Sequence, residues 1–386
     1  MRRRAGGAVA ALCFEVSATL ALDLLASRLG WWRSDGPLLL VATPLPRLGA
    51  TLAFAVLASA LARAPLLLAV VASAALDALV LRATAGTLGE GWILGRALAI
   101  LAGHVPALLV VRWTEAGTRT LGRAALLFLA FPVLPVLVVL VASPSPRALA
   151  PWTLGGAALL IFLLWGAIFE LATRGGGTQF PLDPTRRLVT SGLFAYVANP
   201  MQVGATLLAF ALALVLEDAR LAAVGLAAAV TGIGCAGWDE DRALVARFGP
   251  LARAYRSAVP AWLPRRLPFH ASRSPAPVFA GARAARLVLP PGSAAERFFS
   301  RRPSGLELAQ GAGARYEDGE HADEGLLALV RALDHLGLAW ALLGALLRAP
   351  LSLRREAGSA GADPCSPRPA CSPGTGTGSA CHRPRR

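Results

Sequence analysis

A succession of long apolar segments constrains this chain more than any other feature. A helix needs about 20 predominantly apolar residues to cross the hydrocarbon core of a bilayer. Segments of this kind lie at 8–27, 38–62, 65–82, 92–111, 122–142, 153–173, 201–217 and 220–237. Charged residues make up only 16% of the chain, whereas soluble domains carry about 25%. We therefore predict an all-α integral membrane protein with about eight transmembrane helices.

The arginines predict how these helices are oriented, because basic residues are enriched in cytoplasmic loops. With the N-terminus inside, ten arginines of the connections lie in the cytoplasm: Arg2, Arg3, Arg4, Arg63, Arg112, Arg119, Arg123, Arg174, Arg186 and Arg187. Four lie outside: Arg28, Arg33, Arg82 and Arg147. This asymmetry predicts that the N-terminus and the region after Trp238 face the cytoplasm, and we expect a location in a bacterial inner membrane.

Neither the charge nor the cysteines indicate a nucleic-acid or metal partner. The net charge is +15, but the arginines are scattered between apolar segments, whereas a nucleic-acid interface gathers them in one patch. Cys365, Cys371 and Cys381 are not spaced like a common zinc motif. The oligomeric state is left open by the sequence.

Several ionisable residues lie inside the predicted spans, where such groups often mark a transport path. They are Glu15, Asp23, Asp77, Arg96, His104 and Glu170. The two similar halves and matched broken helices of many transporters are not visible in the sequence. We therefore interpret these groups as structural pairs, with transport as a third-ranked alternative.

The connection 174–200 has clear helix-start chemistry at its end. Asn199 is a good N-cap, Pro200 suits the first helical position, and an apolar run follows. The positive end of the helix dipole favours an anionic group there. Gly204 lies one turn into the helix, where a side chain would obstruct a ligand. An ordinary capped helix is the alternative that these residues leave open.

The segment 238–266 begins with acidic residues and continues as an amphipathic helix. Asp239, Glu240 and Asp241 follow the last predicted span, and Leu244, Phe248 and Tyr255 share one face. The carboxylates either pair with arginines of the same helix or bind the polar groups of a ligand. A helix lying on anionic headgroups is the alternative interpretation.

Together the two segments resemble the isoprenylcysteine carboxyl methyltransferase family, whose superfamily includes phospholipid methyltransferases. RRLVTSGLFAYVANPMQVG is similar to the family motif P-x-x-L-V-x-x-G-P-Y-x-x-V-R-N/H-P-M-Y-x-G. WDEDRALVARFGPLARAYRSAVPAWLP is similar to E-E-x-x-L-x-x-x-F-G-x-x-Y-x-x-Y-x-x-x-V-P-R-W-x-P. The resemblance covers about 95 residues, roughly 174–266.

The resemblance implies an S-adenosylmethionine-dependent methyltransferase that acts on a membrane-associated carboxylate or lipid headgroup at the cytoplasmic face. Tyr196, Asn199, Pro200, Gln202 and Gly204 would line the cofactor pocket. Glu240 and Asp241 would bind polar groups of the cofactor, Tyr255 would help to close the pocket, and Arg186 or Arg187 would hold the acceptor. Positioning and exclusion of water would supply most of the rate acceleration.

One departure from the family motif bears directly on activity. Ala198 stands where the family has Arg or His, so a cation or donor beside the cofactor is missing. This leaves a second function open, namely a catalytically eroded membrane scaffold that keeps the family fold.

The remaining regions complete the predicted domain organisation. We expect N-terminal membrane helices at 1–173, a methyltransferase-like region at 174–268, a linker at 269–284, a small cytoplasmic α/β segment at 285–352 and a disordered tail at 353–386. In the α/β segment, strand, helix and strand are expected at 285–289, 293–302 and 305–310, and a helical region at about 322–348. Their order weakly resembles a thioredoxin-like half domain of the DCC type. Pro290-Pro291-Gly292-Ser293 replaces its C-x-x-C, so thiol chemistry is not expected.

Overall fold

The computed structural model describes most of the chain. The described residues are 2–33, 39–40, 43–44, 54, 57–58, 60, 64–84, 87–143, 145, 147–179, 183–270, 284–302, 305–318 and 321–359. Within these ranges, the side chains of 2–5, 33, 39–40, 43–44, 81, 84, 235–241, 349 and 352–359 lie outside the description.

Among the described residues, four helical stretches are long and apolar enough to cross a membrane: Gly6–Leu29, Trp92–Ala116, Thr120–Ala142 and Pro151–Gly175. The first is α1 (Arg2–Leu29) and the fourth is α8 (Pro151–Gly175). The second consists of α4 (Trp92–Ala99), η2 (Ile100–His104) and α5 (Val105–Ala116). The third consists of α6 (Thr120–Phe128), η3 (Leu129–Val133) and α7 (Leu134–Ala142). The protein is thus a mostly helical integral membrane protein.

Three further predicted spans are helical but shorter, so the predicted number of eight spans is not confirmed. They fall on α3 (Leu66–Thr84), α9 (Pro200–Leu216) and α10 (Ala219–Thr231). Most of the expected span 38–62 lies outside the described residues. Within it, β2 (Leu39–Leu40) pairs with β3 (Thr43–Pro44). Outside it, β1 (Trp32–Arg33) pairs with β4 (Thr87–Leu88).

Two of the long helices contain a widened turn. Ile100–His104 and Leu129–Val133 are π-helical and continue directly into α5 and α7. Pro132 lies inside the second of these turns. Because proline has no N–H to donate to the preceding turn, a locally wider turn lets the helix continue past it.

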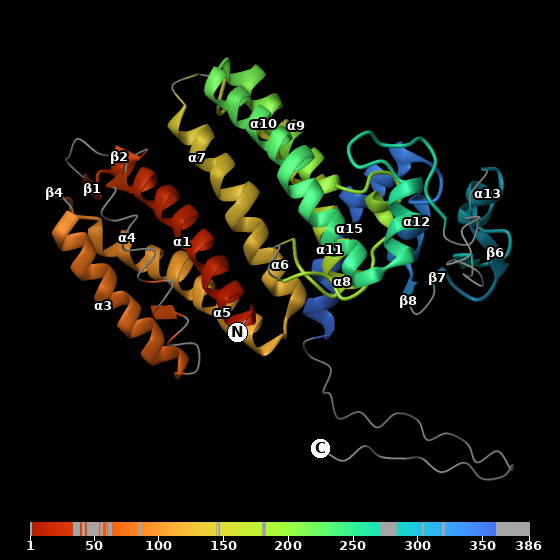
Figure 1. Cartoon of the computed structure of the whole chain (residues 1–386), viewed down its shortest axis with the longest axis horizontal. Helices are drawn as coiled ribbons and strands as arrows, with labels where there is room; N and C mark the ends of the chain where they lie inside the picture. Colours follow the sequence, from red (N-terminus) through yellow and green to blue (C-terminus); the bar gives the residue numbers. More distant parts are fainter. Residues whose placement is uncertain are drawn as a thin grey trace, which may run out of the picture. The chain divides into compact units, whose positions relative to one another are not determined.

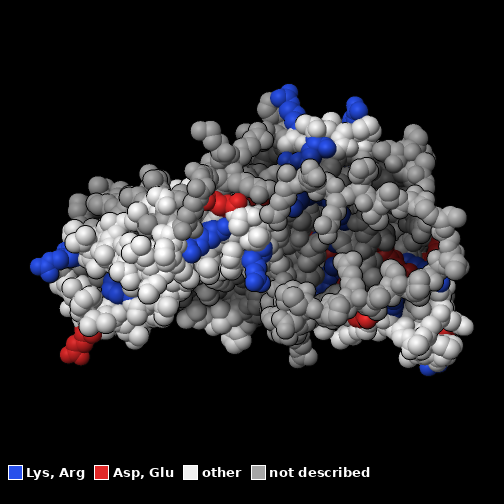
Figure 2. Space-filling model, turned by 90° about the horizontal axis from the view of Figure 1, so that it is seen from below, with Lys and Arg blue, Asp and Glu red and all other residues white. Residues whose placement is uncertain are grey.

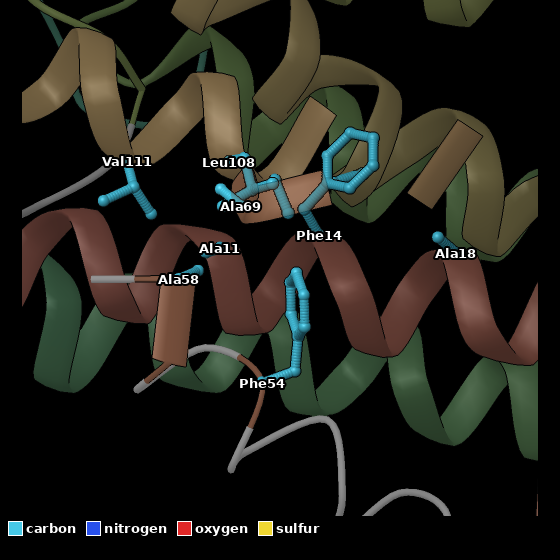
Figure 3. Packing of buried hydrophobic residues seen from close by; sticks show 10 residues of the cluster. Ala11, Phe14, Ala18, Phe54, Ala58, Ala69, Leu108 and Val111 are labelled. Atoms are coloured by element: carbon cyan, nitrogen blue, oxygen red, sulfur yellow. The ribbon is translucent and has the colours of Figure 1, made fainter. Parts of the chain in front are cut away.

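The N-terminal helices pack around α1. Alanines on α1 allow close approach of α5, and Phe14 fills the space between the helices (Figure 3). The same helices enclose a buried polar group in which Glu15 lies 3.0 Å from His104 Nδ1, and Arg96 pairs with Asp77 at 2.7 Å. This confirms the predicted structural pairing of four of the ionisable residues.

The region that carries the two motifs follows α8. A short 3₁₀ segment, η4 (Gly192–Ala195), precedes α9, and α9 and α10 form a hairpin (Figure 1). The chain then continues through η5 (Gly232–Ala236) into α11 (Gly237–Phe248) and α12 (Pro250–Ala258).

The C-terminal segment contains a four-stranded sheet. Its strands are β5 (Arg286–Leu289), β6 (Glu307–Gln310), β7 (Arg315–Asp318) and β8 (His321–Glu324), in the order β6-β5-β7-β8. Strands β5 and β6 are parallel and are connected by α13 (Ala294–Ser300), which confirms the predicted strand, helix and strand.

The expected helical region 322–348 was wrong at its start and in its continuity. Residues 321–324 form β8, which pairs with β7, and the helices are α14 (Leu326–Leu333) and α15 (Leu338–Ser359). Gly325 and Gly337 have positive φ angles, and they separate the strand and the two helices. Helix α15 extends past the expected start of the tail at 353, and residues 360–386 lie outside the described residues.

Charged side chains are sparse on the N-terminal helices. In the space-filling view, the left part of the molecule is mostly white with a few blue and red groups (Figure 2). Several large apolar side chains of α3 and α4 are exposed, among them Leu67, Leu79 and Ile93. Exposed leucines and isoleucines are compatible with contact to lipid.

Candidate active site

The structure brings the two sequence motifs together through their backbones. The N–H of Ala198 donates to Pro260 O at 2.8 Å, and the N–H of Asn199 donates to Ala261 O at 3.2 Å. Two further bonds join the same segments, from Arg265 N to Tyr196 O and from Phe269 N to Ala195 O. The turn before α9 and the loop after α12 therefore form one connected unit.

Helix α9 begins where the sequence predicts, but Asn199 does not cap it with its side chain. Asn199 occupies the N-cap position and Pro200 follows it in the first turn. The Asn199 amide instead donates to Gln202 Oε1 at 3.3 Å and accepts from Arg256 at 3.3 Å. Gly232 of η5 lies beside this group, since a Cβ there would lie 3.1 Å from Gln202 Oε1. The start of α9 thus carries a polar cluster.

Polar contacts hold the connection between α8 and α9 against α6. The guanidinium of Arg123, which is 2% exposed, pairs with Asp183 at 2.7 Å. The amide of Gln179 donates to Ala124 O at 3.2 Å, whereas its buried Oε1 atom has no hydrogen-bond partner among the described residues. An unsatisfied buried acceptor of this kind is costly unless a ligand or water supplies a donor.

A cavity of about 910 Å³ lies between these elements. This volume falls within the range of about 300–1,000 Å³ that is common for small-molecule sites. Its polar lining residues come from the connection, the start of α9, α11 and α12, with one from α1: Cys13, Thr178, Gln179, Thr185, Asn199, Gln202, Arg247 and Tyr255. Its apolar lining comes mainly from η3, α7, α8, α9 and α10, including Val136, Val139, Leu164, Leu208, Ala209, Leu212, Leu221 and Val224.

The polarity of the cavity changes along α9. Gln202 lies at the start of this helix, and the lining residues further along it are Ala205, Leu208, Ala209 and Leu212. From Met201 to Leu212 the helix rises about 16 Å, at about 1.5 Å per residue. One end of the cavity is therefore polar, and the other is an apolar groove between helices.

Three of the predicted site residues line this cavity: Asn199, Gln202 and Tyr255. Tyr255 is 2% exposed, and its hydroxyl donates to Phe194 O at 2.7 Å. Ala198 also lines the cavity and is 8% exposed. The position at which the family motif has a cation is therefore on the cavity wall.

Five other predicted residues lie outside the cavity lining, beginning with Tyr196, Arg186 and Arg187. Tyr196 is fully buried on the opposite side of the turn, where its hydroxyl donates to Asp334 O at 2.7 Å. Burial and the Asp334 carboxylate raise the pKa of this phenol, so the hydroxyl stays protonated and remains a donor. Arg186 and Arg187 are exposed and outside the cavity lining, and their backbone N–H groups bond to Gly175 O.

Pro200 and Gly204 also lie outside the cavity lining. A Cβ at Gly204 would lie 2.6 Å from Leu164, so this glycine lets α9 approach α8, rather than leaving room for a ligand. Glu240 and Asp241 lie in α11, but their side chains are outside the described part of the structure.

The sequence interpretation missed Gln179, Thr178 and Arg247. Arg247 is the one charged side chain among the described lining residues, and it donates to Thr185 O at 3.2 Å across the cavity edge. Gln179 and Thr178 follow a run of glycines that carries no motif. The available signal was a Thr-Gln pair between the end of an apolar segment and the motif that follows, and such a pair predicts no particular site without the fold.

The comparisons with known proteins support a methyltransferase region here. Residues 153–249 match the model of the phospholipid methyltransferase family, which is a family of membrane methyltransferases. No curated protein and no solved structure matches the chain. The match spans α8 to α11 and covers most of the cavity-lining residues. The predicted resemblance is thus confirmed at the level of membrane methyltransferases.

Proposed function

We propose that this protein is a membrane methyltransferase that uses S-adenosylmethionine and acts on an amphiphilic, lipid-like acceptor. The observation that carries the proposal is the cavity of about 910 Å³ built largely from the region that matches the methyltransferase family. Its polar end fits the polar groups of the cofactor, and its apolar groove fits the hydrocarbon part of the acceptor.

The polar end contains residues that fit the cofactor. Gln179 Oε1 is a buried acceptor without a partner among the described residues, so it is available to an N–H or O–H of a ligand. Asn199 and Gln202 add amide groups held in place by their mutual hydrogen bond. S-adenosylmethionine supplies an electrophilic methyl group on a sulfonium centre. The role of these residues would be to orient the cofactor, and the apolar walls would exclude water.

The apolar groove fits the hydrocarbon tail of the acceptor. It follows α9 for about 16 Å, close to the depth of one leaflet, which is about half of a 30 Å hydrocarbon core. Arg247, at the polar end, would hold an anionic group of the acceptor, a role that we had assigned to Arg186 or Arg187. We place this end at the cytoplasmic face, in accordance with the arginine asymmetry.

A second candidate function is a scaffold without catalysis. It is favoured by Ala198, which lies on the cavity wall and provides neither a charge nor a side-chain donor. The two functions differ in a simple assay, because a scaffold would fold and insert normally but would transfer no methyl group.

The test uses purified full-length protein in vesicles made from bacterial polar lipids, with S-adenosylmethionine carrying a tritiated methyl group. We expect the label to enter the lipid fraction with the wild-type protein and with Gln310→Met. Gln310 is an exposed glutamine on β6, so it controls for the substitution itself. Gln202→Met should lower transfer at least about ten-fold, the effect of losing a well-placed polar contact. No transfer by the wild-type protein, together with no cofactor binding, would contradict the proposal.

A further inference from the structure

The turn that carries one wall of the cavity has a second face. Val189, Phe194, Ala198 and Asn199 line the cavity. In the same turn, Leu193, Ala195 and Tyr196 pack with Ala341 and Ala345 of α15. The wall, defined here as residues 189–199, therefore lies between the cavity and the C-terminal segment.

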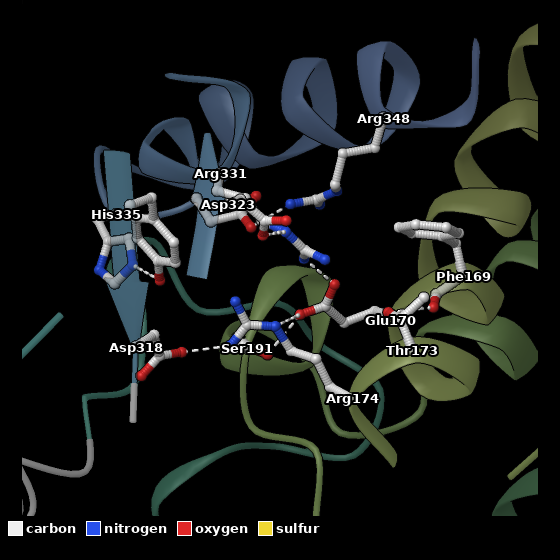
Figure 4. Close-up of polar contacts among 12 residues, drawn as sticks. Phe169, Glu170, Thr173, Arg174, Ser191, Asp318, Asp323, Arg331, His335 and Arg348 are labelled. Atoms are coloured by element: carbon white, nitrogen blue, oxygen red, sulfur yellow. Dashed lines mark hydrogen bonds and ion pairs between the residues drawn. The ribbon is translucent and has the colours of Figure 1, made fainter. Parts of the chain in front are cut away.

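A buried ionic network joins the wall to the C-terminal segment. Glu170 of α8 is fully buried and pairs with Arg331 of α14 and, at 3.1 Å, with Arg174 (Figure 4). The hydroxyl of Ser191, at the start of the wall, donates to the same carboxylate. Arg331 also pairs with Asp323 at 3.3 Å. One carboxylate thus connects the wall to α14 and β8.

The backbone of the wall is held closely against this network. Gly192 has a φ of +61°, which an L side chain adopts with strain. A Cβ at Gly192 would lie 3.4 Å from both the Glu170 side chain and the guanidinium of Arg348. Arg348 in turn pairs with Asp334. The backbone of the wall at Gly192 therefore has little room to move relative to the side chains of Glu170 and Arg348.

A second attachment lies at the far end of η4. The Tyr196 hydroxyl donates to the backbone oxygen of Asp334, which lies between α14 and α15. The next residues of the chain, Ala198 and Asn199, reach the cavity. The C-terminal segment itself contributes none of the described lining residues, so it acts on the cavity only through the elements it contacts, which are this wall and α8.

We propose that the C-terminal segment, residues 285–348, is a positioning element for the cavity, and that it holds the wall through Arg331, Arg348 and Asp334. As a statement about methyl transfer this rests on the proposed function above. The centre of the wall is the short 3₁₀ segment η4, which has few internal hydrogen bonds, so external contacts decide how firmly the wall is held. Tyr196, Ser191 and Glu170 are positioning residues in this arrangement.

The test compares two buried tyrosines whose hydroxyl groups make hydrogen bonds. Tyr196→Phe removes the bonds that join the wall to the backbone of Asp334 and Gly337. Tyr316→Phe removes a bond of 2.9 Å to His335 that lies inside the C-terminal segment. Burial raises the pKa of both phenols, so both hydroxyls are protonated at neutral pH. The readouts are hydrogen exchange of the wall amides, followed by mass spectrometry of full-length protein in detergent, and S-adenosylmethionine affinity.

We expect Tyr196→Phe to speed exchange of the amides of 194–199 about three- to ten-fold and to weaken cofactor affinity by a similar factor, the range expected for one buried hydrogen bond. Ser191→Ala should have the same effect, and Tyr316→Phe should leave both readouts unchanged. Equal exchange in all four proteins, or equal acceleration by both tyrosine variants, would overturn the proposal.

The exchange readout separates this proposal from the proposed function. Faster exchange of the wall in Tyr196→Phe, in a protein that binds no cofactor, would support the positioning element and contradict the methyltransferase proposal. Cofactor binding that is equal in the wild type and in both wall variants, with equal exchange, would contradict only the positioning element.

Discussion

Gly166→Ala tests whether the C-terminal segment packs on α8 as closely as the contacts indicate. A Cβ at Gly166 would lie 2.6 Å from Ala345 Cβ and 3.0 Å from both its Cα and its carbonyl oxygen. Carbon atoms in good contact are about 3.5–4.0 Å apart. Because two of the three neighbours are backbone atoms, no side-chain rotation relieves the overlap. Helix α15 must therefore withdraw by about 1 Å.

The cost follows from two opposing terms. Overpacking in a well-packed core costs about 1–3 kcal/mol, and the rigid neighbours favour the upper end. Alanine has a better helix propensity than glycine by about 1 kcal/mol. The expected net effect is a destabilisation of about 2 kcal/mol, together with faster hydrogen exchange in α15.

Gly155→Ala is the matched control for this experiment. Gly155 lies in the same helix, but nothing lies within 4 Å of a Cβ built there. It should therefore raise the melting temperature in detergent or leave it unchanged, whereas Gly166→Ala lowers it by several degrees. Equal melting temperatures for the two variants would refute the close packing of α15 on α8.

Three further predictions concern the buried charge, the groove and the cofactor. Glu170→Gln leaves buried arginines without their carboxylate and should destabilise the protein by about 3–5 kcal/mol in thermal denaturation. The control Glu217→Gln changes an exposed pair, with 70% of the Glu217 side chain accessible, and should cost less than about 1 kcal/mol. Similar costs for the two variants would mean that the Glu170 network does not form. Ala209→Trp places a large ring in the groove and should raise KM for the lipid acceptor at least about ten-fold with unchanged cofactor affinity, and Ala223→Trp, on the exposed face of α10, should change neither. Glu240→Gln should weaken S-adenosylmethionine binding at least about ten-fold with little change in melting temperature, and unaltered affinity would remove Glu240 from the site.

Local sequence pattern predicted most of the helices. The apolar runs around 8–27, 92–111, 122–142 and 153–173 became the four long helices, because an apolar run of that length satisfies its backbone only as a helix. The same rule does not fix the number of spans, because α9 and α10 are apolar helices that are shorter than the four long ones. The strands β7 and β8 were missed because RYED and HADE are short and polar.

For the site, the motifs predicted which segments meet but not which side chains face the cavity. The N-cap position of Asn199 follows from the Asn-Pro pair that precedes an apolar run. The two motifs indicate that residues 195–199 and 260–269 lie together. Side-chain direction in the turn depends on contacts distant in sequence. Tyr196 turns away from the cavity because Asp334, which is 138 residues further along the chain, accepts its hydroxyl.

The role of the C-terminal segment could not be predicted from the sequence for the same reason. Glu170 was identified as an ionisable residue in a span and interpreted as a member of a structural pair, and its pairing is confirmed. Its partner Arg331 lies 161 residues further along the chain, on a helix whose pattern indicates only an amphipathic surface.

The most direct test of the central claim is equilibrium binding of S-adenosylmethionine to the purified full-length protein. Isothermal titration calorimetry in detergent would measure it, with Gln202→Met and Gln310→Met as the paired variants. The account predicts one saturable site in the wild type and in Gln310→Met, and an affinity at least about ten-fold weaker in Gln202→Met. A well-folded wild-type protein that binds neither S-adenosylmethionine nor its demethylated product at millimolar concentration would contradict it.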